Sequence, residues 1–383
     1  MDVADYRDRF PILSETTYLI NHSLAAMPAA AEDRLAEYAR TWKTRGIRAW
    51  SEGWWTMPLT VGDQVGRIVG APPGTTCMHQ NVTVAAAVIL SCFRPAPPRN
   101  RILYVEGEFP SVRYLLQAQP GVETEVVPDL DALCDAIDER TLLVPVSNVL
   151  FKTAELQDVA AVQRRVEEVG AHVVVDAYQS AGAVPLDVTR LGVAFAVGGS
   201  VKWLCGGPGA GWLYVRPDLV DRLEPTFVGW QGHARPFAFE PELDYADGVA
   251  RFLTGTPNVP ALYAATAGYD VIEEVGVEAI RRRSLDLTDH LIRLADAAGF
   301  EVTSQREPSR RGASVSIRMP GFEAVHRELA ERQILCDFRP DVGLRLGPHF
   351  FNTEEELDFA VSQMEDIVAS KAHEQHLGAA ARF

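Results

Sequence analysis

The chain has 383 residues, more than one hydrophobic core usually supports, so we expect a large domain and a smaller one. Hydrophobic residues make up 47% and charged residues 23%, which is typical of a globular protein, and no apolar run reaches the about 18 residues that a membrane span needs. A formal net charge of −16 disfavours binding to an anionic phosphate backbone. We therefore expect neither a membrane nor a nucleic acid as a partner.

The N-terminal sequence "MDVADYRDRFPILSE" is acidic and lacks the basic and apolar regions of a secretory signal, so we expect a cytoplasmic protein. The five cysteines are an odd number and have no metal-binding spacing. We expect reduced thiols that pack as small apolar groups, and no metal site.

Short apolar runs alternate with helical patterns between residues 101 and 217. The runs are apolar on both faces, which predicts the strands of a mostly parallel sheet covered by helices on both sides. They are "RILYVEG", "LLVPVSN", "AHVVVDA", "VAFAVGGS" and "GWLYVRP", with helical segments such as "DVAAVQRRVEEVG" between them. We assign residues 1–255 to an N-terminal arm and this large α/β domain.

The pattern changes in the C-terminal part of the chain. One long helical stretch is predicted over residues 261–299, followed by strands in "ASVSIRMP" and "QILCDFRP" and by a helix in "TEEELDFAVSQMEDIVASKA". Residues 256–383 are therefore expected to form a small α+β domain. We expect the tail "HEQHLGAAARF" to be frayed.

Asp176 and Lys202 each follow an apolar run of the predicted sheet. Ligands of open α/β sheets bind at the carboxyl ends of the strands, so the two side chains can converge on one ligand. Pyridoxal phosphate needs a lysine for its Schiff base, a carboxylate on its ring nitrogen, and backbone N–H groups for its phosphate. The segment "HQNVTVAAAVILSCF" opens a helix with polar residues 79–83 and supplies such a cradle. Taken alone, any one aspartate or lysine is more often a solvated surface residue than part of a site.

Taken together, these motifs resemble the class V branch of the fold type I pyridoxal phosphate enzymes, and within it the kynureninases. The resemblance covers nearly the whole chain. It rests on "YLINHSLAAMP", "GIRAWSEGWW", "EGEFPSVRY", "SVKWLCGGPGAGWLYV", "GWQGHARPFAF" and "ILCDFRPDVGLRLGPHFFNTEEEL". Other segments, "DAYQSAG", "VSNVL" and "GTPN", look more like the cysteine desulfurases.

The resemblance implies a role for each matching residue and a homodimer whose site takes residues from both subunits. At the cofactor ring, the implied roles are Schiff-base lysine for Lys202, ring-nitrogen partner for Asp176, stacking for Phe109, and hydrogen bonds to the ring hydroxyl for Asn148 and Gln179. Phosphate contacts are implied for Val82, Thr83 and Ser200, and from the neighbouring subunit for Trp230 and Thr256. For the substrate, the resemblance implies that Arg345 binds the α-carboxylate and that Ser23 and Trp50 bind the side chain.

Structural explanations compete with several of these roles. Phe109 suits a core and Trp230 an interface without any cofactor. Thr83 and Ser200 suit helix caps. Arg345 suits a surface ion pair, whose loss would cost little.

The chain also departs from the kynureninases at three polar positions. Val201 replaces a tyrosine, Gln179 replaces a histidine and Val112 replaces an acid, so we expect slow or no turnover of kynurenine. Desulfurases need a nucleophilic cysteine on a loop before the carboxylate arginine, whereas Cys336 lies in a predicted strand. We expect kynureninase-like cleavage at Cβ of an L-amino acid. The alternatives are β-elimination of a sulfur-linked amino acid, class V transamination, and cofactor binding without catalysis.

Overall fold

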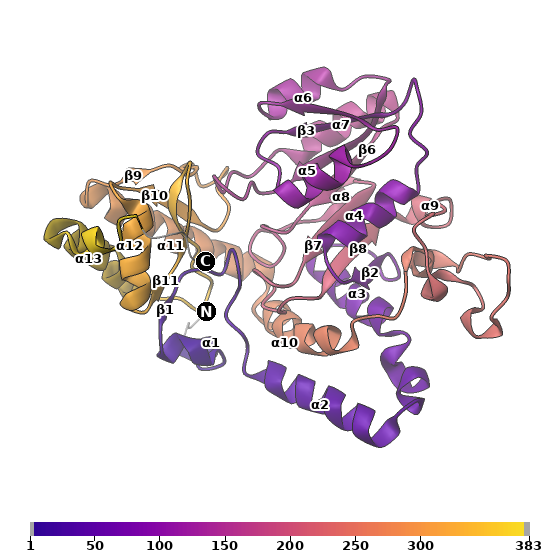
Figure 1. Cartoon of the computed structure of the whole chain (residues 1–383), viewed down its shortest axis with the longest axis horizontal. Helices are drawn as coiled ribbons and strands as arrows, with labels where there is room; N and C mark the ends of the chain where they lie inside the picture. The colour runs from indigo at the N-terminus through magenta and orange to yellow at the C-terminus, as the bar shows by residue number, and fades with distance from the viewer. Residues whose placement is uncertain (1–3, 379–383) are drawn as a thin grey trace.

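The structure, a computed structural model, describes residues 4–378. Figure 1 shows a large domain beside a smaller C-terminal one, drawn in orange and yellow. The large domain contains a seven-stranded sheet in the order β2-β8-β7-β6-β5-β3-β4, in which β8 runs antiparallel to the other six strands. The strands are β2 (Thr76–His79), β3 (Arg101–Val105), β4 (Glu123–Val127), β5 (Thr141–Ser147), β6 (His172–Asp176), β7 (Phe195–Gly199) and β8 (Gly211–Val215). The predicted α/β fold with a mostly parallel sheet is confirmed.

Helices cover both faces of this sheet because its strands are apolar on both faces. In β6, Val173 and Val175 pack into one core while Val174 packs into another, as the period of two requires. The first core is closed by α3 (Met57–Ile68), α6 (Leu130–Ala136), α7 (Val159–Val169) and α10 (Val259–Val275), and the second by α4 (Val82–Ser91) and α5 (Pro110–Gln117).

The small domain has its own sheet and its own core. Its four-stranded antiparallel sheet has the order β12-β13-β10-β9. The strands are β9 (Glu301–Val302), β10 (Val315–Arg318), β12 (Asp337–Arg339) and β13 (Gly343–Leu346), and the helices that complete the third core are α11 (Val277–Ala297), α12 (Phe322–Glu331) and α13 (Glu354–Ser370).

The remaining helices are short, except for α2, which lies along the outside of the large domain at the bottom of Figure 1 and packs against α10. These remaining α-helices are α1 (Ala4–Arg7), α2 (Ala30–Arg45), α8 (Val188–Leu191) and α9 (Pro217–Val220).

Two predictions about the C-terminal part were wrong. The single helix expected over residues 261–299 is divided at Gly276, whose φ of 80° ends α10 and starts α11. Such a backbone angle is readily adopted only by glycine. The strand expected around Cys336 is also divided, and Cys336 lies between β11 (Ile334–Leu335) and β12.

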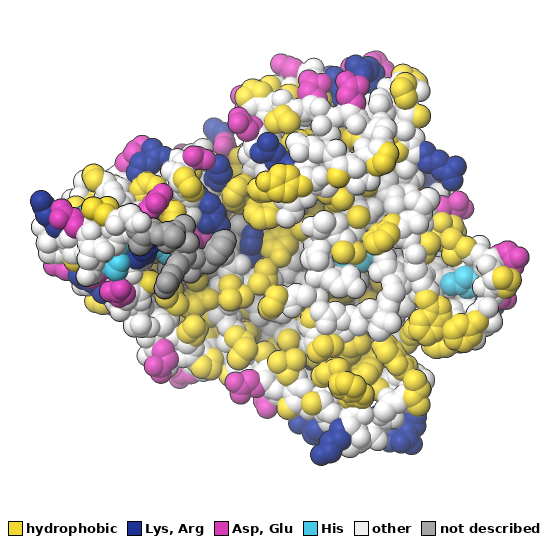
Figure 2. Space-filling view, in the orientation of Figure 1, with side chains coloured by type: hydrophobic (Ala, Val, Ile, Leu, Met, Phe, Trp, Pro, Cys, Tyr) yellow, Lys and Arg dark blue, Asp and Glu magenta, His cyan; other side chains and the backbone are white. Residues whose placement is uncertain are grey.

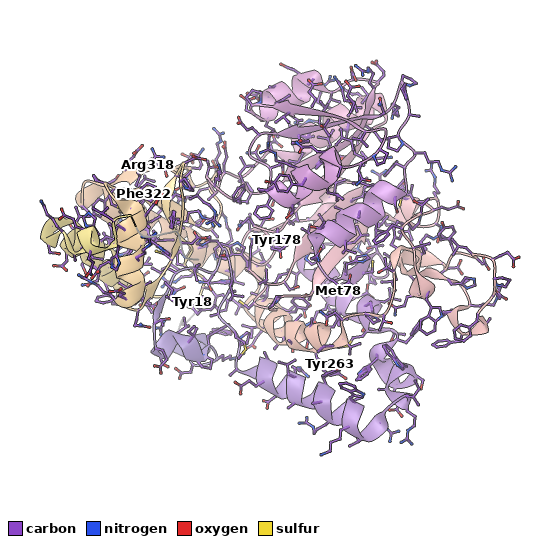
Figure 3. All side chains as sticks on the ribbon, viewed as in Figure 1. Tyr18, Met78, Tyr178, Tyr263, Arg318 and Phe322 are labelled. Carbon is purple, nitrogen blue, oxygen red and sulfur yellow. The ribbon has the colours of Figure 1, made fainter. Side chains whose placement is uncertain are left out.

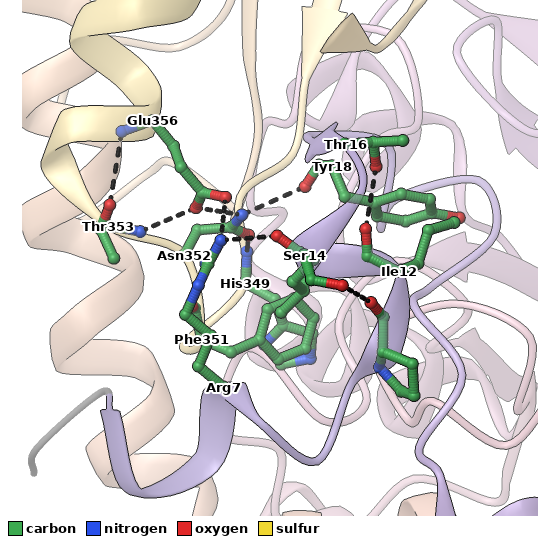
Figure 4. Close-up of polar contacts among 12 residues, drawn as sticks. Arg7, Ile12, Ser14, Thr16, Tyr18, His349, Phe351, Asn352, Thr353 and Glu356 are labelled. Carbon is green, nitrogen blue, oxygen red and sulfur yellow. Dashed lines mark hydrogen bonds and ion pairs between the residues drawn. The ribbon is translucent and has the colours of Figure 1, made fainter. Parts of the chain in front are cut away.

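The N-terminal arm is attached to the small domain. Strand β1 (Thr17–Tyr18) pairs in parallel with β11. Figure 4 shows the contacts nearby: Arg7 donates to Glu356 at 2.7 Å, and Asn352 donates to the Tyr18 carbonyl at 3.2 Å. Because the arm then crosses to the large domain, it brings the segment after β1 between the two domains. The boundary expected at residue 255 stays a prediction.

Part of the C-terminal tail is ordered, contrary to expectation. Residues Ala372–His376 form a 3-10 helix, and His376 contacts Glu328 on α12 at 3.1 Å. Residues 379–383 lie outside the described part of the chain. Within residues 4–378, the helices are too short or too polar to cross a membrane.

Candidate active site

The candidate residues of the large domain meet at one edge of its sheet. Strands β5, β6 and β7 are parallel, so their ends at Ser147, Asp176 and Gly199 lie on the same edge. Strand β2 runs in the same direction as these strands, because β2 and β7 are both antiparallel to β8, which lies between them. His79, at the end of β2, pairs with Gly211, and Gly211 pairs with Gly199. The end of β2 therefore lies at this edge as well. The start of α4 therefore lies roughly two strand spacings, about 10 Å, from the end of β7.

Lys202 follows β7 and places its amine between two aromatic rings. The Lys202 Nζ lies 4.4 Å from the ring centre of Tyr178 and 5.6 Å from that of Phe109. Figure 3 shows Tyr178 on the side of the large domain that faces the small domain. Burial lowers the pKa of Lys202 to about 8, although Asp176 acts to raise it. Among the described residues, no hydrogen bond or ion pair holds the Lys202 amine, so it is free to react.

Asp176 lies at the end of β6 and is buried. Its Oδ1 accepts a hydrogen bond from the Tyr178 backbone N–H at 2.8 Å. Burial raises the pKa of Asp176, while this hydrogen bond and the charge of Lys202 oppose the rise. A cation next to the carboxylate would therefore be strongly favoured.

The polar atoms around Lys202 fit pyridoxal phosphate. The side-chain oxygen of Asn148 is buried and has no partner among the described residues, and the backbone N–H of Asn148 donates to the backbone carbonyl of Asp176 at 2.8 Å. Lys202 would bind the aldehyde of this cofactor, Asp176 would pair with its ring nitrogen, and Phe109, Tyr178 and Asn148 would contact its ring. The unpartnered amide indicates that a polar ligand belongs there.

The predicted phosphate cradle is formed only in part by the expected side chains. Helix α4 begins at Val82, and Asn81, not Thr83, caps it by accepting from the Val84 N–H at 3.0 Å. Thr83 is exposed at this N-terminus, where N–H groups attract an anion. The Ser200 hydroxyl is turned to other partners, since it donates to the Ala210 carbonyl at 2.6 Å and contacts the Tyr269 hydroxyl.

Gln179 binds protein groups at both ends of its amide. It donates to the His22 carbonyl at 3.1 Å and accepts from the Trp203 indole at 3.2 Å. It therefore connects the arm to the segment after Lys202 and is already engaged where a ring-hydroxyl contact was expected. Ser23 follows His22 in this loop, and Ala25 donates to the Val201 carbonyl at 2.9 Å.

Arg345 lies on β13, opposite Asp337 on β12. The Arg345 Nε donates to Asp337 Oδ1 at 2.8 Å, Nη2 donates to Oδ2 at 2.5 Å, and Nη1 donates to the Phe151 carbonyl at 2.5 Å. The residue is 2% exposed, so this is a buried pair and not the surface pair considered above. The Phe151 ring contacts that of Phe109 at 5.2 Å, which links Arg345 to the Lys202 site.

Trp50 and Trp230 lie on a partly exposed aromatic surface. Trp50 contacts Trp55 at 6.3 Å between ring centres, and Trp55 contacts Trp230 at 4.8 Å. Thr256 is exposed in a segment next to Trp230, where the Gln231 N–H donates to the Thr254 carbonyl at 3.1 Å. Its neighbours Gly255 and Pro257 line a small pocket together with His79, the last residue of β2.

Sequence reasoning missed several residues of the site. The only sequence feature that indicates Tyr178 is its position two residues after Asp176. Asp337 could have been found as a cross-strand partner, because "DFRPDVGLR" is compatible with a hairpin. Glu108 is buried beside Phe109 and accepts from the Ser147 N–H at 2.7 Å. Burial raises the pKa of Glu108 to about 8.

Comparisons with known proteins agree with this geometry. The family model for aminotransferase class-V matches residues 17–350. The chain belongs to the class-V aminotransferase family. It is 32% identical to the kynureninase of Pseudomonas fluorescens, over 97% of this chain and 94% of that protein, and 30% identical to the kynureninase of Burkholderia pseudomallei (strain 1106a), over 97% and 93%.

Solved structures of this fold include other class-V enzymes. A cysteine desulfurase from Thermococcus onnurineus NA1 superposes with a TM-score of 0.84 at 21% identity, covering 96% of this chain and 98% of that one. A C-DES variant with glycine covalently linked to the PLP cofactor superposes with a TM-score of 0.86 at 22% identity, covering 94% and 99%. These likenesses establish the fold type I architecture.

This class-V chain is a pyridoxal-phosphate-dependent, kynureninase-like enzyme that acts on an L-amino acid. Its cysteines do not suit desulfurase chemistry. Cys205 and Cys336 are buried, and burial raises the pKa of both thiols far above neutrality. Because the thiolate is the nucleophile, these thiols are inert.

Proposed function

We propose that this enzyme hydrolyses the Cβ–Cγ bond of an L-amino acid that carries a carbonyl group at Cγ. The observation that supports this most is the convergence of Lys202, Asp176 and Arg345, which come from both domains, in a chain similar to kynureninases over 97% of its length. Pyridoxal phosphate, when bound, supplies an electron sink for the bonds at Cα.

The proposed work of the protein is to position groups and to move protons. Lys202, with its pKa lowered to about 8 by burial, is suited to take a proton from Cα near neutral pH. Asp176 would hold a proton on the ring nitrogen of the bound cofactor, and Phe109 and Tyr178 would contact its ring. Arg345 orients the α-carboxylate through charge-assisted hydrogen bonds.

The departures from the kynureninases bear on the substrate. Val201 offers no hydroxyl next to Lys202, and the Gln179 amide is engaged by His22 and Trp203. The ring centre of Tyr178 lies 4.4 Å from the Lys202 amine, and burial raises the pKa of its phenol to about 12, so the hydroxyl stays protonated and can donate. We expect L-kynurenine itself to be a slow substrate, because the donor comes from a different position.

The test is product analysis with purified holoenzyme. We expect L-alanine and an acid to be released from amino acids with an aryl ketone at Cγ, including slowly from L-kynurenine, because hydrolysis of Cβ–Cγ leaves Cβ as a methyl group. A Lys202→Ala variant should release neither product. Release of pyruvate and a thiol from cysteine conjugates, with no alanine from any ketone, would instead support β-elimination.

We further propose that the enzyme is a homodimer whose sites take Trp230 and Thr256 from the neighbouring subunit. Figure 2 shows hydrophobic side chains gathered over the end of α2 and the loop after α9. They include Trp42, Ile47, Trp230, Phe237 and Phe239, of which Ile47 is 80% and Phe239 75% exposed. An apolar surface of this kind favours association. The cytoplasmic location stays a prediction.

A further inference from the structure

A buried polar cluster lies between the arm and the small domain, next to the Lys202 site. At its centre is Asp337, whose carboxylate contacts Arg345, Arg339 and His22. Electrostatic interactions of Arg345 and Asp337 with Lys202 contribute to the pKa of that lysine. The cluster is therefore close enough to affect what binds at Lys202.

Three hydrogen bonds and one ion pair hold the Asp337 carboxylate. Its Oδ1 accepts from Arg345 Nε at 2.8 Å and from His22 Nε2 at 2.9 Å. Its Oδ2 accepts from Arg345 Nη2 at 2.5 Å and lies 3.3 Å from Arg339 Nη2 in an ion pair. Both oxygens are therefore engaged. Asp337 is thus fixed in position by its neighbours.

His22 contributes as a neutral donor. Burial lowers the pKa of His22 to about 4, so the ring is uncharged at neutral pH. A carboxylate can only accept, so the proton lies on Nε2. The carbonyl of His22 accepts from Gln179, which in turn binds Trp203, the residue after Lys202. Hydrogen bonds therefore connect the Lys202 segment with Arg345.

The remaining donors of Arg345 match one carboxylate. A guanidinium has five N–H groups, and Asp337 and the Phe151 carbonyl take three of them, on Nε, Nη1 and Nη2. One N–H remains on each terminal nitrogen, which is the number that a bidentate carboxylate accepts. The charges fit too, since Arg345, Arg339, Asp337 and a neutral His22 sum to +1.

We propose that Asp337 is a positioning residue for substrate binding: it holds one edge of the Arg345 guanidinium so that the two remaining N–H groups are presented together to the α-carboxylate. This inference rests on the proposed role of Arg345. It explains why a second carboxylate occupies an anion site. If Asp337 acted only through its negative charge, it would weaken the binding of the substrate carboxylate. If it orients Arg345, it strengthens that binding.

Removal of the charge separates these two possibilities. We expect Asp337→Asn holoenzyme to bind L-alanine, the amino acid left by the proposed cleavage, roughly tenfold to a hundredfold more weakly, because an amide cannot accept from both nitrogens of the guanidinium. Binding of L-alaninamide, which lacks the carboxylate, should be unchanged. Both are measured by spectral titration of the bound cofactor.

A matched control removes another acid from a buried arginine of the same domain. Arg311 is fully buried and contacts Asp289, the Arg306 carbonyl and Thr288. Asp289→Asn should leave both affinities unchanged. If Asp337→Asn does not retain the cofactor, Asp337→Glu gives the same test, since it keeps the charge and displaces the carboxylate by one methylene.

Equal or tighter binding of L-alanine by Asp337→Asn, or unchanged binding by Asp337→Glu, would overturn the inference. The Arg345→Ala variant distinguishes this failure from that of the proposed function. If Arg345→Ala binds L-alanine normally, Arg345 is not the carboxylate site. If it binds weakly while the Asp337 variants bind normally, only the positioning role of Asp337 is wrong.

Discussion

Lys202 shows how burial and one neighbouring charge set the reactivity of a residue. Burial lowers its pKa to about 8, and Asp176 acts in the opposite direction. A lysine must be neutral to attack an aldehyde, and here the neutral form is accessible near physiological pH. The same amine lies 4.4 Å from the ring centre of Tyr178 and 5.6 Å from that of Phe109.

This balance predicts the pH dependence of cofactor loading. The rate at which apoenzyme takes up pyridoxal phosphate should rise with pH and level off above about pH 8, because the neutral amine increases through that range. Asp176→Asn removes the charge that raises the pKa of Lys202, so the midpoint should move to lower pH. Stopped-flow absorbance gives the midpoint, and borohydride reduction followed by peptide mapping identifies Lys202. An unmoved midpoint in Asp176→Asn would contradict this account.

Helix α10 matters at the scale of elements because it supports the segment after Lys202. Gly268 lies in the middle of α10, where an added Cβ would be 2.2 Å from the Leu204 carbonyl oxygen. The helix can approach this segment only because position 268 has no side chain. Tyr269, the next residue, contacts the Ser200 hydroxyl. The packing of α10 thus fixes the backbone on both sides of Lys202.

We expect Gly268→Ala to lower the free energy of unfolding by about 1–3 kcal/mol or more, the usual cost of overpacking, and to weaken cofactor retention. Gly66 is the matched control, since it also lies inside a helix but its added Cβ would be 3.1 Å from a side-chain atom, the Thr76 hydroxyl, and not against backbone. Gly66→Ala should be nearly neutral. Urea denaturation and cofactor absorbance after dialysis measure the two effects. Equal stability of both variants would show that α10 can shift without cost.

At the scale of the whole molecule, each chain has a catalytic edge and an exposed aromatic surface that holds other predicted site residues. Trp230 contacts Trp55 on that surface, and Thr256 is exposed in a neighbouring segment. A dimer that covers the surface would bury its apolar side chains and complete both sites together. Cofactor affinity should then depend on protein concentration.

Phe239→Asp tests the proposed dimer, because it puts a charge on the surface without touching the Lys202 edge. We expect sedimentation to show a shift from dimer to monomer and the absorbance of bound cofactor to fall on dilution. Phe359→Asp, on the exposed side of α13 in the small domain, is the control and should change neither. A wild-type monomer that retains its cofactor at high dilution would contradict the dimeric site.

The fold class could be predicted from the sequence alone. Strands apolar on both faces require helices on both faces, and parallel strands bring their carboxyl ends to one edge. Asp176 ends β6 and Lys202 lies three residues after the end of β7, so the local pattern places both residues at that edge. The long helix over residues 261–299 was misjudged at Gly276, because a single glycine does not reveal whether a helix continues.

Only the tertiary structure decided which polar partners these residues have. Arg345 pairs with Asp337 across a hairpin, and His22 reaches the same carboxylate from a position 315 residues away in the chain. The family resemblance implied cofactor contacts for Gln179 and Ser200, and the structure gives their hydrogen bonds to His22, Trp203, Ala210 and Tyr269. Hydrogen bonds depend on distances within a few tenths of an ångström. Those distances are set by the packing of both domains and the arm, which no local pattern encodes.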